Sequence, residues 1–128
     1  PNRAGIYDYI RRAEGEVEDC LDLVHLQADE QTIPAMLKEV GYSTCLSGKW
    51  HLSSKFPSDT QPSPGYFGFD HWFATHSNAS PSHENPDNFV SNGKEVGKLE
   101  GFSCQIVVDE ALNWLQNKET AVDLTIKY

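Results

Sequence analysis

The stretch TIPAMLKEVGYSTCLSGKWHL, residues 32–52, decides the fold, because it reads as a helix that runs directly into a strand. Four apolar side chains keep the spacing of one helical face: Ile33, Met36, Leu37 and Val40. Thr32 or Asp29 is expected to cap this helix, and Gly41 is expected to end it in a left-handed conformation. Residues 42–48 are then predicted to form a short, buried strand.

The predicted strand leads into a lysine and a histidine, Lys49 and His51. In an extended chain, their spacing puts both side chains on one face, at the carboxyl end of the strand, where open α/β sheets bind ligands. A lysine supplies a fixed positive charge and a histidine a proton donor or acceptor, so the pair suits an oxyanion. By spacing alone, a lysine and a histidine in a solvated loop remain the alternative.

The distribution of charge limits the classes of partner. The chain has 128 residues, a size typical of one domain, and a formal net charge of −9. That charge argues against nucleic-acid binding, and no apolar run is long enough to cross a membrane. Residues 14–30 hold seven carboxylates, whereas residues 41–58 hold none. An acid-free window tolerates an anionic ligand, although chance clustering explains it equally well.

Further strand signals follow downstream. Residues 69–76 are aromatic and predict a short strand. Asn92-Gly93 predicts a hairpin within residues 89–96, because both residues accept the positive φ of a tight turn. Residues 121–128 are predicted to form a last strand.

A second helix is predicted over residues 103–118, with Ser103 as its N-cap. One face of it gathers six apolar or small residues: Cys104, Val107, Val108, Ala111, Trp114 and Leu115. Four side chains are expected in the core: Cys45, Trp50, Trp72 and Cys104. Residues 1–30 predict loop, with a short helical turn at residues 19–24. Alternating helices and strands favour an α/β fold, with helices packed on a fragment of a mostly parallel sheet.

The opening stretch resembles a signature of the sulfatase family, within the alkaline-phosphatase-like superfamily. The signature is Gly-Tyr, a small residue, a short apolar segment and Gly-Lys-Trp-His-Leu, and GYSTCLSGKWHL matches it at residues 41–52. Gly-Phe-Asp follows at the expected place, residues 68–70, and SPSHENP (80–86) and LEGFSCQIVVDEALNWL (99–115) are also similar to bacterial sulfatases. The resemblance covers nearly the whole chain and implies part of an alkaline-phosphatase-like fold.

The resemblance also implies roles for individual residues. The lysine that matches Lys49 contacts the sulfate and the formylglycine nucleophile. The histidine that matches His51 contacts that nucleophile and helps to break down the sulfated intermediate. The loop after Gly-Phe-Asp can supply a polar residue to the substrate, which makes Ser82 or His83 a candidate for substrate binding. Loop residues that bond their own backbone are the alternative.

Residues 1–128 are therefore expected to be an internal portion of a sulfatase catalytic domain. The sequence lacks the Cys/Ser-x-Pro-Ser-Arg motif of the nucleophile and any spacing typical of a metal site. The nucleophile and the ligands of Ca²⁺ are thus expected outside this chain, which alone is expected to be inactive. The parent protein is expected to cleave sulfate esters of a small molecule or carbohydrate, in the periplasm or after secretion, although this chain carries no signal peptide.

Two alternatives stay open. In the first, the chain is a non-catalytic protein, either a truncated product or an anion-binding module. In the second, the parent protein cleaves phosphodiesters or phosphonates, as other members of the superfamily do. The Gly-Lys-Trp-His-Leu form of the signature favours sulfate.

Overall fold

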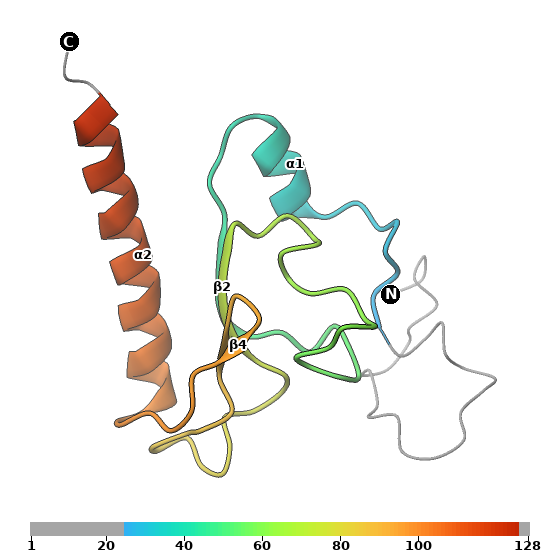
Figure 1. Ribbon diagram of the computed structural model, residues 1–128, viewed down its shortest axis with the longest axis vertical. Helices are drawn as coiled ribbons and strands as arrows, with labels where there is room; N and C mark the ends of the chain where they lie inside the picture. The colour runs from blue at the N-terminus through green and yellow to red at the C-terminus, as the bar shows by residue number, and fades with distance from the viewer. Residues whose placement is uncertain (1–24, 126–128) are drawn as a thin grey trace.

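The computed structural model describes residues 25–125, with side chains through residue 118. In chain order the elements are α1 (Ile33–Glu39), β1 (Cys45–Lys49), β2 (His71–Thr75), β3 (Val90–Ser91), β4 (Lys94–Glu95) and α2 (Ser103–Thr125). Figure 1 shows α2 running along one side of the strands and α1 on the other. Within this range, no helix is both long and apolar enough to cross a membrane.

The strands form one sheet in the order β1-β2-β3-β4. β1 and β2 are parallel, and the other neighbours are antiparallel. The predicted α/β fold is confirmed, although the sheet is mixed, because the β3–β4 hairpin adds an antiparallel edge. The hairpin turn is the predicted one, since Asn92 (φ 47°) and Gly93 (φ 90°) take the positive φ values of such turns.

Helix α1 begins and ends as predicted. The Thr32 hydroxyl accepts a hydrogen bond from Ala35 N (3.4 Å), donates one to Phe67 O (2.6 Å) and so caps the helix. Gly41 ends it with a φ of 89°. The apolar face, however, is open, since none of the helical residues is buried and Ile33 is 73% exposed. The described residues therefore leave this face without a cover.

Gly68 lies directly against the first turn of α1. A Cβ atom at this position would clash with Ala35 N and lie 2.8 Å from Pro34 C, and the φ of Gly68 is +97°. Both the close approach and the backbone conformation require glycine here. Gly68 of the Gly-Phe-Asp segment therefore serves to pack this segment against α1.

A clamp between Thr44 and Asp70 precedes the two parallel strands. Thr44 N donates to Asp70 Oδ2 at 3.0 Å, and Asp70 N and His71 N both donate to Thr44 O, at 3.0 and 3.2 Å. Lys38 Nζ of α1 lies 2.7 Å from Asp70 Oδ1. The hydrogen bonds with Lys38 and then with Thr44 lower the pKa of Asp70. The clamp sets the register, because Cys45 and His71 are the first paired residues of β1 and β2.

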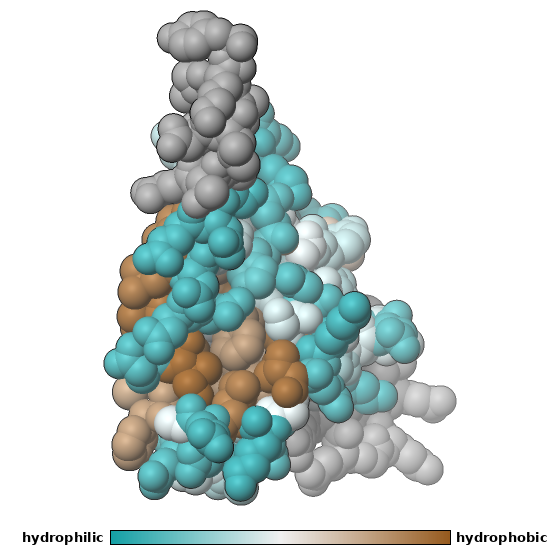
Figure 2. Space-filling model, turned by 60° about the vertical axis from the view of Figure 1, so that its left-hand side comes forward, coloured by the Kyte–Doolittle hydropathy of each residue, from teal (hydrophilic) through white to brown (hydrophobic). Residues whose placement is uncertain are grey.

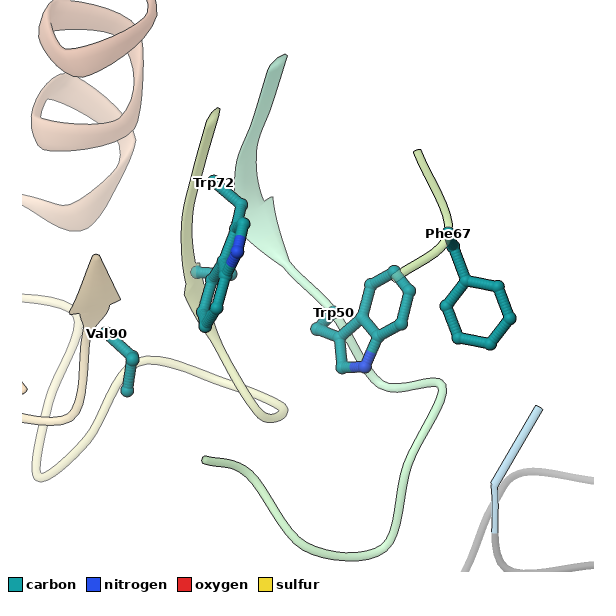
Figure 3. Packing of buried hydrophobic residues seen from close by; sticks show 5 residues of the cluster. Trp50, Phe67, Trp72 and Val90 are labelled. Atoms are coloured by element: carbon teal, nitrogen blue, oxygen red, sulfur yellow. The ribbon is translucent and has the colours of Figure 1, made fainter. Parts of the chain in front are cut away.

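The core lies on the face of the sheet opposite α2. Figure 3 shows Trp50 facing Phe67, with Trp72 between Trp50 and Val90. The rings of Trp50 and Phe67 are 5.7 Å apart, and both tryptophans are 6% exposed. The prediction that Trp50 and Trp72 are core residues is therefore confirmed.

Helix α2 packs on β1 and β2 through polar contacts, and a partly open apolar groove remains between the helix and β1. Ser47 Oγ donates to Val107 O at 2.7 Å, and His71 Nε2 lies 2.7 Å from Glu110 Oε1. A groove of about 430 Å³ runs between the helix and Cys45. Apolar atoms gather on this side of the molecule (Figure 2), and three side chains of α2 stay about half exposed: Val108, Leu112 and Leu115.

Four predictions about the second helix and the cysteines are wrong. Residues 121–125 continue α2 rather than form a strand, because a helix satisfies its own backbone groups, whereas a strand needs a partner. Cys104 is exposed in the first turn, and Cys45 is only half-buried. Ser103 is the first helical residue rather than the cap, since Phe102 O accepts from Ile106 N. Residues 1–24 and 126–128, with the turn predicted at 19–24, lie outside the described residues.

Replacing Gly68 by alanine should detach α1 from the core. Gly68→Ala should lower the free energy of unfolding by about 1–2 kcal/mol for the left-handed backbone and by about 1–3 kcal/mol more for the clash with Ala35. Gly97→Ala is the matched control, because Gly97 also has a positive φ (+74°) but nothing lies within 4 Å of an added Cβ. Urea unfolding of both variants measures the difference, and equal losses would contradict the packing role.

The Asp70 carboxylate should make stability depend on acid. Its pKa is lower in the folded chain than the ordinary 3.8, so its contribution is present above that value and is lost as the pH falls through the lower, folded value. Asp70→Asn should lower the free energy of unfolding by about 1–2 kcal/mol at neutral pH and flatten its fall below about pH 4. Thermal melts across this range test it. Asp87→Asn, at an exposed carboxylate, should leave the melts close to wild type.

Candidate functional site

Lys49 is the last residue of β1 and faces the same side of the sheet as α2. Alternate residues of a strand share a face, and Cys45 and Ser47 line the groove beneath α2. Lys49 continues this row. Its neighbour in the parallel ladder is Thr75, the last residue of β2. The carboxyl ends of both parallel strands therefore meet at Lys49, the edge at which open α/β sheets bind ligands.

A cavity of about 300 Å³ opens at this edge. Lys49 and Thr75 line it from the strands, His83 from the loop after β2, and Ser103 and Cys104 from the first turn of α2. Lys49 is exposed, and among the side chains of residues 25–118 its ammonium group forms no ion pair with a carboxylate. A cation that is not already neutralised, beside neutral polar groups, suits an anionic ligand.

His83 is fixed at this cavity by pairing with the residues that lead into α2. Ser103 N donates to His83 O at 2.7 Å, and Asn85 N donates to Gly101 O at 2.8 Å. Gly101 N donates in return to Asn85 Oδ1 at 2.8 Å. The Ser103 hydroxyl lies 2.8 Å from His83 Nδ1. The structure thus places a residue predicted to bind substrate beside Lys49, far from it in the sequence.

His51 lies outside the row that holds Lys49. The prediction that both side chains share a face assumed an extended chain as far as His51. That assumption is wrong, because β1 ends at Lys49 and His51 has a left-handed φ of 47°. The ring of His51 instead lies 5.5 Å from that of His76, edge to face. His76 Nε2 donates to Ser53 O at 2.6 Å, which holds this second imidazole in place. The catalytic role of His51 stays a prediction.

Ser82, the other candidate for substrate binding, is exposed and bonded within its own turn. Its hydroxyl accepts a hydrogen bond from Glu84 N at 3.1 Å. The residues that line the Lys49 cavity include His83 but not Ser82. This arrangement matches the alternative of a loop residue bonded to its own backbone, and a role of Ser82 toward substrate stays a prediction.

Thr75 and Ser103 also line the cavity, although the sequence does not single them out as site residues. Thr75 belongs to the predicted aromatic strand, and only the register with β1 places it beside Lys49. Ser103 has the signal of a helix cap, but its hydroxyl bonds to His83 instead. Their roles depend on contacts between distant segments, which local patterns do not contain.

The remaining ionisable groups do not form a metal centre within the described range. Among the side chains of residues 25–118, no group of three His, Cys, Asp or Glu is placed to hold a metal ion. Burial under α2, and to a smaller extent Glu110, raises the pKa of the Cys45 thiol. Cys104 is exposed.

The fold and the cavity define an α/β protein with a fixed cation at the carboxyl edge of two parallel strands. The sequence model of the family described as Sulfatase matches residues 4–123. The chain therefore belongs to the sulfatase family.

Two curated relatives agree with this assignment. The chain is 37% identical over 95 residues to N-acetylglucosamine-6-O-sulfatase of Bacteroides thetaiotaomicron. This alignment covers 71% of this chain and 14% of that protein. It is 33% identical over 75 residues to N-acetylgalactosamine-6-sulfatase of Canis lupus familiaris. This second alignment covers 59% of this chain and 14% of that protein. The aligned part is thus 14% of the length of either relative.

Solved structures confirm the fold. A protein solved in complex with its substrate, D-glucosamine-2-N,6-O-disulfate, has a TM-score of 0.53 and 34% identity, over 73% of this chain and 17% of that one. Ps i-CgsB, solved in complex with k-i-k-neocarrahexaose, has a TM-score of 0.62 and 22% identity, over 86% of this chain and 26% of that one. At that identity, the second likeness shows the fold alone.

Proposed function

We propose that this chain is an internal portion of a sulfatase catalytic domain and that Lys49 binds the sulfate group in the intact protein. One observation carries the proposal: the Lys49 ammonium lies at the carboxyl edge of β1, exposed at a cavity that His83 and Ser103 also line, and without an ion pair among the described residues. Sulfate-ester cleavage builds negative charge on oxygen, and a preorganised cation stabilises that charge more than it stabilises the ground state.

His51 is proposed to transfer a proton in the step that releases sulfate. An imidazole suits this task near neutral pH. Its contact with His76, which is itself bonded to Ser53 O, keeps the two rings next to the end of β1. Attack on sulfur is assigned to the formylglycine nucleophile that the family resemblance implies, outside the described residues.

Calcium is proposed as the cofactor of the intact protein, and its ligands are assigned to segments outside this chain. The described residues do not fit a metal site, so none of them is given a role toward the ion. The chain by itself is proposed to bind anions without turnover. A periplasmic or secreted location of the intact protein is likewise a proposal.

The substrate is proposed to be a sulfated carbohydrate, of the amino-sugar class. The support comes from two relatives at more than 30% identity: one is an N-acetylglucosamine-6-O-sulfatase, and the other was solved with D-glucosamine-2-N,6-O-disulfate. Phosphodiesters and phosphonates are the competing substrates, and comparing turnover of sulfate and phosphate esters of one sugar separates these classes.

Removing the Lys49 ammonium should impair catalysis without unfolding the protein. In the intact protein, Lys49→Ala should lower turnover of a sulfated amino sugar by roughly 10²–10³, the typical loss for one electrostatic donor. Lys55→Ala is the matched control, because Lys55 is exposed and lines a separate cavity. Turnover and thermal melting are measured side by side. Full activity of Lys49→Ala would show that this lysine does not bind the sulfate.

Removing the His51 imidazole should slow the release of sulfate more than the release of the sugar. His51→Ala should lower turnover by about 10²–10⁴ and change the pH profile, with a burst of free sugar before the steady state. Rapid-quench measurements of both products test this. Lys55→Ala is the control, because Lys55 is exposed and lines a separate cavity, and it should give no burst. A His51→Ala variant that releases both products together would contradict the assigned step.

A further inference from the structure

We propose that Ser103 is a positioning residue, which holds the His83 imidazole so that its Nε2–H group donates to the anion bound at Lys49. This inference rests on the proposed function and names a second binding group and the residue that orients it. His83 and Lys49 line one cavity from different elements, so two donors can meet one oxyanion there.

The position of the His83 ring is set twice by Ser103. The backbone amide of Ser103 donates to His83 O at 2.7 Å, which fixes the main chain. The hydroxyl lies 2.8 Å from Nδ1, which fixes the ring. Asn85 reinforces the pairing through two bonds with Gly101, both 2.8 Å long. Because Ser103 starts a long helix that is docked on β1, the ring is held by a rigid element.

In this proposal the Ser103 hydroxyl is the donor to His83 Nδ1, which fixes the nitrogen that carries the ring proton. A neutral imidazole has one donor and one acceptor nitrogen. When the Ser103 hydroxyl donates to Nδ1, the proton of the neutral ring lies on Nε2, and in the charged imidazolium Nε2 carries a proton as well. Toward the side chains of residues 25–118 and the described backbone, the His83 ring bonds through Nδ1 alone, which leaves Nε2 for a ligand.

This arrangement divides the work between the two groups. Lys49 contributes a positive charge, whereas the Nε2–H group of His83 contributes a directional hydrogen bond to another oxygen of the same anion. Loss of the orientation should therefore weaken binding more than it slows the chemical step. Ser103→Ala in the intact protein should raise KM about fivefold, the equivalent of one neutral hydrogen bond, with little change in kcat.

The proton position can be read directly by NMR on the 15N-labelled intact protein without ligand. At about pH 8 an ordinary imidazole is neutral, and long-range 1H–15N spectra distinguish protonated from unprotonated ring nitrogens. The signals of His83 are assigned by their loss in His83→Gln. Wild type and Ser103→Thr, which keeps the hydroxyl, should show almost only the Nε2–H form. Ser103→Ala should move toward the mixture of a free imidazole.

Several results would overturn the inference. They are a wild-type His83 protonated mainly on Nδ1, Ser103→Ala spectra identical to wild type, and a kcat effect in place of the KM effect. The wild-type spectrum alone is decisive if Ser103→Ala does not fold. The ligand-free measurement also separates the two proposals, because full activity of Lys49→Ala would end the proposed function while leaving the proton position of His83 as a distinct result.

Discussion

The hydrogen-bonded clamp between Thr44 and Asp70 is the constraint on which the site depends. It ties the residues just before β1 and β2 to each other, and Lys38 adds an ion pair from α1. From that starting point the parallel register carries Lys49 beside Thr75 at the other end of the strands. A slip by one residue would turn Lys49 to the opposite face of the sheet. The Gly-Phe-Asp segment thus acts at a distance from the cavity that it positions.

A second set of backbone bonds closes the cavity from the loop side. Residues 83–85 pair with residues 101–103, which draws the long loop after β2 against the start of α2. The contact of Ser47 with Val107 docks that helix on β1. Strand, loop and helix therefore meet at one point, although they are distant in sequence. Rigid support of this kind holds binding groups more accurately than a free loop does.

The exposed apolar faces fit a chain that aligns with 14% of the length of its sulfatase relatives. Ile33 on α1, Val40 at its C-cap and Leu112 on α2 keep half or more of their surface accessible within the described structure. A helix with a periodic apolar stripe gains most of its stability by burying that stripe. The periodicity is thus a correct sign of a helix, but it does not say whether the covering partner lies in the same segment.

The sequence by itself determined the local elements and the family. Spacing, capping and turn residues predicted α1, the β1 and β2 strands and the Asn92-Gly93 hairpin, because each depends on neighbours within a few positions. The Gly-Lys-Trp-His-Leu signature pointed to the family and to Lys49. Only the tertiary structure decided that Lys49 lines one cavity with His83 rather than lying in line with His51, that Cys104 is exposed, and that residues 121–125 stay helical. The physical reason is that these features are relations between distant segments. The place of Lys49 depends on the register of β1 and β2, and that of His51 on the backbone turn past β1. Residues 121–125 stay helical because the described residues offer them no pairing strand.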